Sequence, residues 1–345
     1  MPFTVGVSIS GTKGDLLSTA ATVAERAERL GFDSVEFAEG AHDPFLACVV
    51  AAEHSSRLQV HTSVAIAFPR SPMVTAMLAW DLQRFSGGRF VLGLGTQVKA
   101  HSERRFSVPW TAPAPRVREY IRAMEAIWTT FQDGAPLRFE GKHYQFSLMN
   151  PNFNPGPIEH PGIPVELAAV NPFNAGVAGE VCSGIKLHPF HTPGYLREVL
   201  LPSIERGRAR AGRDRAGFTV RGGGLIASGR RPADVEQSAL EVRRWIAFYG
   251  STRAYQPVFD QLGEHELGGR LRALASQGKW DDLSEVVPDE LVSRIGVVAP
   301  YETLATALRA RYGGVVDHIS FNDEFFADAD DDDALAMVVS ELQSG

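Results

Sequence analysis

Short apolar runs alternate with helical patterns along almost the whole chain. Residues 3–10 are rich in β-forming side chains, and from Leu16 to Leu30 the apolar positions repeat at helical spacing until Gly31 ends the helix. A second apolar run, 34–38, follows at once and completes a β–α–β unit. Strands that are apolar along their whole length and separated by helices are typical of a parallel sheet buried on both faces.

The same alternation continues to the end of the chain. We expect further strands at 58–66, 90–94, 165–170, 185–188, 218–226 and 315–321, with helices at 73–85, 117–131, 195–211 and 301–312. With the first two strands this makes eight, and eight β–α units close most simply as a (β/α)8 TIM barrel, an α/β fold. Two segments, near 132–164 and 251–294, exceed the minimal barrel. We interpret them as insertions within a single domain that spans residues 1–345.

Composition and charge indicate which kinds of binding partner and which cellular compartment to expect. The net charge is −7, from 41 acidic and 34 basic residues, and no Lys/Arg-rich block is present, which argues against nucleic-acid binding. The two cysteines, Cys48 and Cys182, lie in apolar stretches and are predicted to be buried thiols in a reducing compartment. The chain shows no signal-peptide pattern at its start and no run of 18 apolar residues. We therefore expect a cytoplasmic protein that acts on a small molecule, away from membranes.

The chemistry of such a barrel lies where its strands end. Glu39 and His42 follow the second strand and are the best acid/base candidates, although a cap or an ion pair would also explain them. Asp43 precedes Pro44, which predicts a helix N-cap. His188 begins an H-x-x-H spacing, but no cysteine or carboxylate completes a ligand set, so we predict no metal site.

Three other segments have both a binding and a structural interpretation. Asn171-Pro172 predicts a capped helix whose free N–H groups suit a phosphate, and a well-capped helix alone explains the same pattern. Residues 93–96 allow close approach of a flat ligand or simply tight packing, and residues 99–105 offer positive charge or a solvated helical face. The acidic run 328–333 departs from the calcium-loop pattern and is typical of a solvated helix N-terminus.

Five segments together resemble a known family over nearly the whole chain. They are the His42-Asp43-Pro44-Phe45 turn, Thr62-Ser63-Val64, and residues 71–97, 98–106 and 178–190. The resemblance is to the luciferase-like monooxygenase superfamily and, within it, to the coenzyme F420-dependent oxidoreductases. It implies hydride transfer at the deazaflavin C5, with reduction of C=C, C=N or C=O groups or oxidation of an alcohol. Glu39, His42 or His188 would then move the proton.

The resemblance also implies where the cofactor lies. A cis peptide at Ser63–Val64 would press on the middle ring, Gly95 to Gln97 would line the ring and ribityl chain, and Ala168 to Asn171 would hold the phosphate. The cofactor-binding residues implied in this way are Thr62, Ser63, Val64, Gly95, Thr96, Gln97, Ala168, Ala169, Val170 and Asn171.

Departures from the family pattern leave two alternatives open. The sugar-phosphate dehydrogenases of the superfamily carry Asp-His and Glu where this chain has Glu39-Gly40 and Val98, so sugar-phosphate oxidation is not expected. An FMN-dependent monooxygenase is the first alternative, and a catalytically degenerate cofactor-binding protein is the second. Members of the family often dimerise, so the resemblance allows a homodimer without requiring one.

Overall fold

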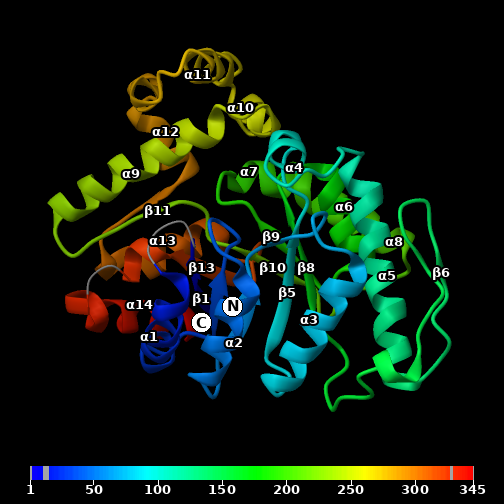
Figure 1. Cartoon of the computed structure of the whole chain (residues 1–345). Helices are drawn as coiled ribbons and strands as arrows, with labels where there is room; N and C mark the ends of the chain where they lie inside the picture. The colour runs from blue at the N-terminus through cyan, green and yellow to red at the C-terminus, as the bar shows by residue number, and fades with distance from the viewer. Residues whose placement is uncertain (1, 11–14, 327–328, 345) are drawn as a thin grey trace.

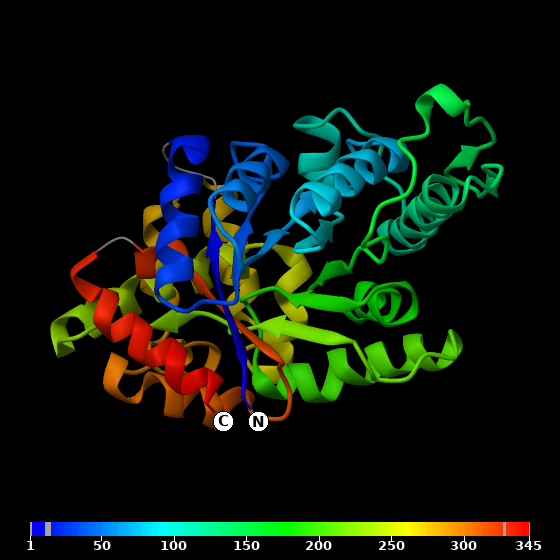
Figure 2. The ribbon, with the colours of Figure 1, turned by 90° about the horizontal axis from the view of Figure 1, so that it is seen from below.

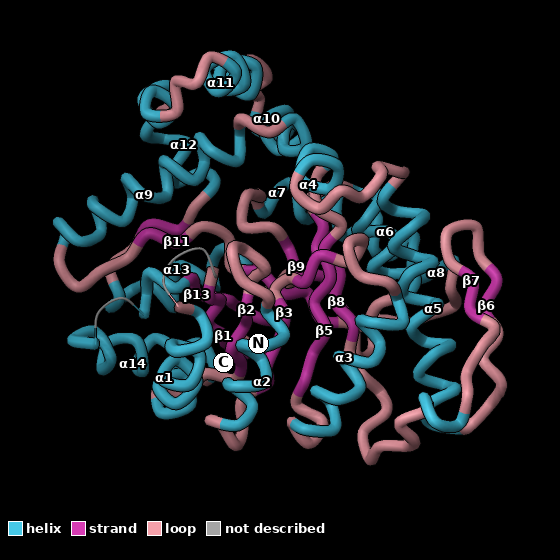
Figure 3. The backbone as a smooth tube through the Cα atoms, in the orientation of Figure 1, coloured by secondary structure: helices cyan, strands magenta, loops and turns pink. Residues whose placement is uncertain are grey.

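Eight parallel strands form a closed barrel in the computed structural model, which describes residues 2–10, 15–326 and 329–344. Each strand pairs with its neighbours in parallel, and the pairing of β3 with β5 closes the ring, which forms the centre of the molecule (Figure 3). The predicted TIM barrel is therefore confirmed. Its strands are β1 (Thr4–Ile9), β2 (Ser34–Phe37), β3 (Gln59–Thr62), β5 (Phe90–Gly95), β8 (Val165–Ala169), β9 (Gly184–Leu187), β10 (Thr219–Gly222) and β13 (His318–Asn322).

Helices surround the barrel. Two of them, α2 (Pro44–Glu53) and α6 (Pro172–Val181), begin at the caps that the sequence predicted. In α2 the Asp43 carboxylate accepts a hydrogen bond from the Phe45 N–H, and Pro44 is the first helical residue. The Phe3 N–H donates to the Leu342 carbonyl at 2.9 Å, so the two ends of the described chain lie together (Figure 2). The helices are α1 (Leu16–Arg29), α2 (Pro44–Glu53), α3 (Pro72–Phe85), α4 (Lys99–Arg104), α5 (Pro113–Asp133), α6 (Pro172–Val181), α7 (Pro193–Tyr195), α8 (Leu201–Arg210), α13 (Tyr301–Tyr312) and α14 (Asp332–Gln343).

A group of four helices, which we call the cap, lies over one end of the barrel (Figure 1). They are α9 (Pro232–Gly250), α10 (Gln256–Leu262), α11 (Leu267–Ser276) and α12 (Asp289–Ile295). The cap lies on the same side as α4 and α7, which follow the carboxyl ends of β5 and β9. It contains the segment 251–294 that we interpreted as an insertion, and α9 is part of the same group. The carboxyl end of the barrel is therefore covered on one side.

The other proposed insertion lies away from this end. Between α5 and β8 the chain forms a short antiparallel hairpin of β6 (Phe139–Glu140) and β7 (Gln145–Phe146), which lies beside α5 (Figure 3). The Glu119 carboxylate of α5 accepts hydrogen bonds from the His143 and Tyr144 N–H groups at 2.6 Å each. This segment therefore packs on the outer helices rather than at the carboxyl end of the barrel.

Three predicted elements are interrupted in the structure. The strand expected at 58–66 is divided into β3 and β4 (Ala65–Ile66) by a cis peptide at Ser63–Val64, which confirms the cis bond that the family resemblance implied. The strand expected at 218–226 is divided at Gly223 and Gly224, whose positive φ angles of 137° and 69° end β10. Beyond this break, β11 (Ile226–Ala227) leaves the barrel sheet and pairs with β12 (Val297–Val298). The helix expected at 195–211 is interrupted by a π-helical turn at Leu196–Leu200.

The apolar core lies between the strands and the helices around them. Cys48 and Cys182 are both fully buried there and unpaired, as predicted, and burial raises the pKa of each thiol. Within the described residues, every helix is too short or too polar to cross a lipid bilayer. Two acidic residues of the 328–333 run, Asp332 and Asp333, begin α14 and pair with arginines: Asp332 contacts Arg26 at 2.6 Å, and Asp333 contacts Arg230. Asp328 lies outside the described residues.

Candidate active site

The barrel interior holds a layer of buried charged side chains. Lys186 on β9 crosses the barrel to contact the Glu36 carboxylate on β2, and Arg221 on β10 pairs with Glu166 on β8 at 2.9 Å and with Glu36 at 3.4 Å. Burial by itself would raise the pKa of Glu36, but Lys186, His318 and Arg221 outweigh it and hold the pKa well below its ordinary value. The two carboxylates and two cations therefore form a charge-balanced cluster, which we call the charged layer.

A glycine and two neutral histidines border the charged layer. Gly6 on β1 faces it, and a Cβ atom there would lie 2.2 Å from the Ser34 hydroxyl and 2.7 Å from His318 Nε2, so only glycine leaves room for the cluster. His318 lies 3.2 Å from Glu36, yet burial, reinforced by Arg221, lowers the pKa of His318 to about 3. Burial likewise lowers the pKa of His61 well below its ordinary value. Both imidazoles are therefore neutral near pH 7.

The residues expected to bind the cofactor lie on three neighbouring strands. Ser63 and Val64 follow β3, Gly95 to Gln97 end β5, and Ala168 to Asn171 end β8; β3, β5 and β8 are adjacent in the barrel. A Cβ atom on Gly95 would lie 2.6 Å from Val64 Cγ2, so the absence of a side chain there lets β5 lie directly against Val64. The structure therefore brings these residues into one continuous arc at the carboxyl end of the barrel, which we call the arc.

Two residues of the arc have their polar groups engaged within the protein. The Thr62 hydroxyl donates to the Gly93 carbonyl at 2.8 Å and accepts from the Gly93 N–H at 3.0 Å, so it holds β3 against β5. Gln97 adopts a positive φ of 59°, and its side-chain oxygen accepts from the Val98 N–H. The Thr62 hydroxyl has therefore already donated its one proton within the protein and cannot donate it to a cofactor.

The N-terminus of α6 differs from our expectation. Asn171 is its N-cap, as predicted, and its side-chain oxygen accepts from the Phe173 and Asn174 N–H groups at 3.1 Å each. Pro172 has no N–H, so the expectation of free N–H groups in the first turn is wrong for this state of the protein. The Asn174 amide nitrogen donates to Thr96 at 3.3 Å, and its oxygen is buried without a partner. A phosphate at this turn would have to displace the Asn171 cap.

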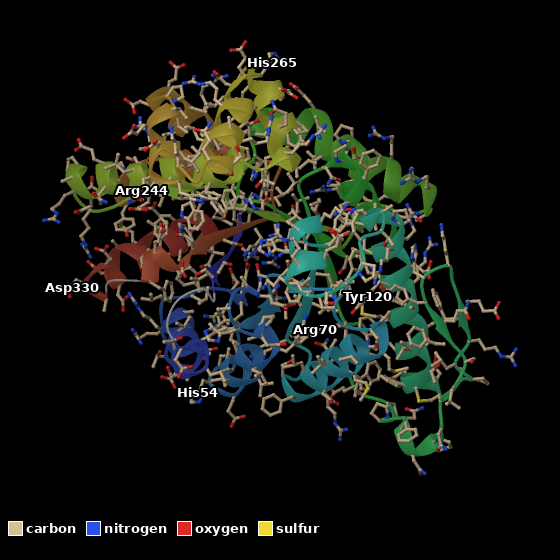
Figure 4. All side chains as sticks on the ribbon, turned by 45° about the horizontal axis from the view of Figure 1, so that its top comes forward. His54, Arg70, Tyr120, Arg244, His265 and Asp330 are labelled. Carbon is tan, nitrogen blue, oxygen red and sulfur yellow. The ribbon has the colours of Figure 1, made fainter. Side chains whose placement is uncertain are left out.

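Glu39 and Asp43 share one arginine. Glu39 Oε2 accepts from Arg70 at 2.7 Å and from the Ile66 N–H at 2.7 Å, while Arg70 reaches Asp43 at 2.6 Å. Arg70 lies toward the middle of the molecule, in contrast to the peripheral His54 (Figure 4). The Glu39 side chain is only 8% exposed. These contacts favour the ion-pair interpretation of Glu39 over a role as a free base, whereas His42, next to this pair, is exposed.

His188 lies on the opposite side of the barrel from Glu39 and His42, because β9 and β2 are four strands apart. Its Nδ1 accepts from the Phe190 N–H at 3.1 Å, and its Nε2 lies 3.0 Å from the Tyr255 hydroxyl. Because Nδ1 accepts, the ring proton is on Nε2 and is donated to Tyr255. Burial, with a contribution from His191, lowers the pKa of His188 to about 3. The three proposed acid/base residues therefore do not form one cluster.

Aromatic residues from the cap surround His188. Its ring packs edge-on against Tyr249 of α9 with centroids 4.5 Å apart, and Tyr255 lies 4.7 Å away. Phe190 joins the group 5.5 Å from Tyr255, and Phe259 lies 5.3 Å from Phe190. This cluster fastens the cap to the end of β9. Tyr249 and Tyr255 thus come to the carboxyl end of the barrel from a segment far along the chain.

His191, near the same end of the barrel, is a buried histidine whose lowered pKa makes the stability of the fold depend on pH. Its Nδ1 donates to the His188 carbonyl at 2.7 Å, Nε2 is buried without a partner, and burial lowers its pKa from 6.5 to about 4 despite that bond. The folded state therefore binds a proton less readily than the unfolded state. Stability from this group is present above pH 6.5 and is lost as the pH falls toward 4.

A His191→Asn variant, which keeps a donor for the His188 carbonyl, should show a weaker dependence of stability on pH. Between neutral pH and pH 5, the wild type should lose about 2 kcal/mol more unfolding free energy than the variant. Urea denaturation at several pH values measures this. The exposed His265, at the periphery of the molecule (Figure 4), supplies the control His265→Asn, which should follow the wild type. Parallel curves for His191→Asn and wild type would contradict the burial of a neutral His191.

Comparison with known proteins decides the family. A family model described as luciferase-like monooxygenase matches residues 2–318. The chain belongs to this family. An uncharacterized protein of Mycobacterium tuberculosis is 44% identical to this luciferase-like chain over 313 residues, covering 91% of it and 92% of the relative. A second protein of that organism, which carries the name "Putative coenzyme F420-dependent oxidoreductase", is 28% identical over 79% of the chain and 81% of its own length.

Solved structures of the family share the fold. Coenzyme F420-dependent tetrahydromethanopterin reductase from Methanopyrus kandleri superposes with a TM-score of 0.80 at 18% identity, covering 99% of this chain and 98% of the reductase. The oxygenating component of 3,6-diketocamphane monooxygenase from Pseudomonas putida, in complex with FMN, gives 0.68 at 17% identity over 99% and 98% of the chains. The family match and the named relative support an oxidoreductase. The solved structures show that its fold serves both deazaflavin and flavin enzymes.

The charged layer and the tyrosines of the cap were not among the residues predicted from the sequence. A signal for the layer was present: Glu36, Glu166, Lys186 and Arg221 are single charged residues within otherwise apolar strands. Charged side chains are rarely buried without partners, so four such strands predict mutual pairing inside the barrel. Tyr249 and Tyr255 had no comparable signal, because only the folding of the cap places them beside His188.

Proposed function

We propose that this luciferase-like protein is a coenzyme F420-dependent oxidoreductase that transfers a hydride between the deazaflavin C5 and a small organic substrate. The observation that carries the proposal is the arc, in which side-chain-free Gly95 lies against Val64 and continues into Ala168 to Asn171 on the next strand. Support also comes from the 28% identical relative whose name includes coenzyme F420. The reaction is reduction of a C=C, C=N or C=O group or oxidation of an alcohol.

The residues of the arc fit a flat cofactor with a polar chain. Val64 and Gly95 provide an apolar surface without a projecting side chain at β5, and the buried, unpartnered Asn174 oxygen beside Thr96 offers an acceptor to the chain's hydroxyl groups. The Asn171 cap must open for a phosphate to use the α6 N-terminus. When bound, the deazaflavin would supply the hydride. The protein would shield it beneath the cap.

Tyr255 is our candidate for the proton donor. Its oxygen accepts from His188 Nε2, so its own hydrogen is directed elsewhere, and no described residue accepts it. Burial raises the pKa of Tyr255, which keeps the hydroxyl protonated at neutral pH. His188, being neutral, positions the tyrosine rather than acting as an imidazolium acid. We propose Tyr255 as the proton donor in place of Glu39, which is paired with Arg70, and of His188, and we keep His42 as the second candidate.

The first experiment is a paired fluorescence titration of the cofactor-free protein with oxidised F420 and with FMN. Binding of F420 at about micromolar strength or tighter, with FMN much weaker, would support the proposal. A preference for FMN together with substrate-dependent oxygen consumption would instead indicate the monooxygenase alternative. Binding of F420 without turnover on a panel of ketones, imines, enones and alcohols would indicate a degenerate site. Binding of neither cofactor would contradict the placement of the arc.

Removing the Tyr255 hydroxyl should lower turnover while cofactor binding is kept. In Tyr255→Phe, kcat for a substrate found in that panel should fall about 100-fold, because a positioned proton donor contributes at least that much. The dissociation constant for F420 should stay within about twofold of wild type. Tyr301→Phe is the matched control, because Tyr301 donates to Asp331 away from the arc. Unchanged turnover in Tyr255→Phe would remove the residue from this role.

A further inference from the structure

The charged layer is more exposed on the side that faces the carboxyl end of the barrel. On β13, His318 is 1% exposed whereas Ser320, two residues nearer the carboxyl end, is half-buried; on β9, Gly184 is buried whereas the Lys186 side chain is 14% exposed. Glu36 is completely buried beneath them. Solvent and small molecules therefore reach this layer from above, and the first charged group they meet is the Lys186 ammonium.

Lys186 has a hydrogen-bond donor to spare. Its ammonium carries three N–H groups. One donates to Glu36, and a second donates to the Ser320 hydroxyl at 3.1 Å, which in turn donates to Glu36 at 3.0 Å. No other described residue accepts from Lys186, so the third N–H lacks a partner. Because the ammonium is partly exposed toward the carboxyl end, this N–H is free to donate to water or to an oxygen atom of a ligand.

The side chains above the layer are small. Residues two positions further along each strand face the same interior, because side chains alternate along a strand. These positions hold glycine, alanine or serine on seven of the eight strands: Ser8, Ala38, Ser63, Gly95, Ala168, Gly223 and Ser320. On β9 the residue two positions beyond Lys186 is His188. Large side chains at these positions would fill the barrel above Lys186. On β3, β5 and β8, the strands of the arc, no such side chain lies between the arc and the ammonium, whereas His188 lies above it on β9.

The charge of the layer selects the kind of oxygen that fits. Glu36 and Glu166 balance Lys186 and Arg221, and His61 and His318 are neutral. An uncharged acceptor would satisfy the free N–H without disturbing this balance. A carboxylate or phosphate would add a negative charge to a buried site whose cations are already paired, at a cost in desolvation.

We propose that Lys186 is a specificity-determining residue that binds an uncharged carbonyl oxygen of the substrate and discriminates against carboxylates and phosphates. This inference rests on the proposed oxidoreductase function and names the substrate class for the same site. It assigns Lys186 a binding role beneath the cofactor, distinct from the proton donation assigned to Tyr255. Glu36 and Ser320 act as positioning residues for the ammonium.

The test uses cyclohexanone as the neutral probe and cyclohexanecarboxylate as the anionic one, with protein saturated with oxidised F420. Calorimetry should show tighter binding of the ketone than of the carboxylate. The infrared C=O stretch of the bound ketone should shift to lower frequency than in water, because a cationic donor polarises the carbonyl. In Lys186→Met, the ketone should bind about tenfold more weakly or worse, and the frequency shift should vanish.

Lys186→Met leaves Glu36 without its nearest cation, so a second variant guards against misfolding. The double variant Glu36→Gln with Lys186→Gln removes one charge of each sign and keeps Arg221 paired with Glu166; it should show the same loss of affinity and of the shift. Ketone binding that is equally strong in the variants, absent in wild type, or weaker than carboxylate binding overturns the inference. Both probes are also titrated without F420, so failure of F420 to bind would count against the proposed function alone.

Discussion

Glu36→Gln is expected to lower the free energy of unfolding by about 3–5 kcal/mol at neutral pH. Glu36 is completely buried and is the common partner of Lys186, Arg221 and Ser320. Glutamine keeps the size of the side chain but removes its charge, which leaves Lys186 as a buried cation without a counter-charge. Breaking a buried pair on one side is costly because the remaining charge still pays for its desolvation. Chemical denaturation followed by circular dichroism measures the loss.

The control for this variant is an exposed ion pair. Glu103 pairs with Lys99 on α4, where both side chains are exposed, and Glu103→Gln should leave the unfolding free energy unchanged within error. The double variant Glu36→Gln with Lys186→Gln should recover much of the loss, since neither charge is then left alone. A Glu36→Gln protein as stable as wild type would show that the charged layer is not assembled as described.

Gly95→Val is expected to weaken F420 binding by about tenfold to a hundredfold. A Cβ atom at this position would lie 2.6 Å from Val64 Cγ2, so any side chain must push Val64 out of place. Because Val64 and Gly95 form the apolar part of the arc, the displaced side chain would enter the space proposed for the cofactor ring. Fluorescence titration of the folded variant with F420 measures the change.

A matched glycine lies outside the site. Gly162, in the loop before β8, has no atom within 4 Å of a Cβ position, and its backbone suits any residue. Gly162→Val should therefore bind F420 as wild type does. Equal affinity of Gly95→Val and Gly162→Val would mean that the cofactor does not lie against Val64, and the arc would lose its assigned role.

Much of the barrel was predictable because its signals are local. Fully apolar strands, helical periodicity and caps such as Asp43-Pro44 are encoded by residues close together in the chain, and the predicted elements lie within a few residues of those observed. The errors occurred where backbone geometry ends a strand within an apolar run. The strand expected at 58–66 breaks at Ser63–Val64, and the one expected at 218–226 breaks at Gly223 and Gly224.

The candidate site was predictable in part. Residues of the arc were named from their positions at strand ends and from the family resemblance, and the barrel brings them together on adjacent strands. The roles of individual side chains were harder to predict from the sequence. Arg70 forms an ion pair with the Glu39 carboxylate, and the Asn171 side chain accepts hydrogen bonds from the N–H groups we expected to be free. Each of these contacts depends on rotamers and on partners that the strand pattern does not specify.

The sequence by itself determined that this protein is a (β/α)8 barrel of the luciferase-like family with a site at the carboxyl ends of its strands, because periodicity and strand-end motifs are local. Only the tertiary structure decided which groups meet. Closure of the barrel brings Lys186 from β9 across to Glu36 on β2, 150 residues away in the chain. Folding of the cap brings Tyr255 to His188, 67 residues apart. Such pairs form only when the barrel and the cap fold, and the local sequence shows nothing of them beyond a charged residue in an apolar strand.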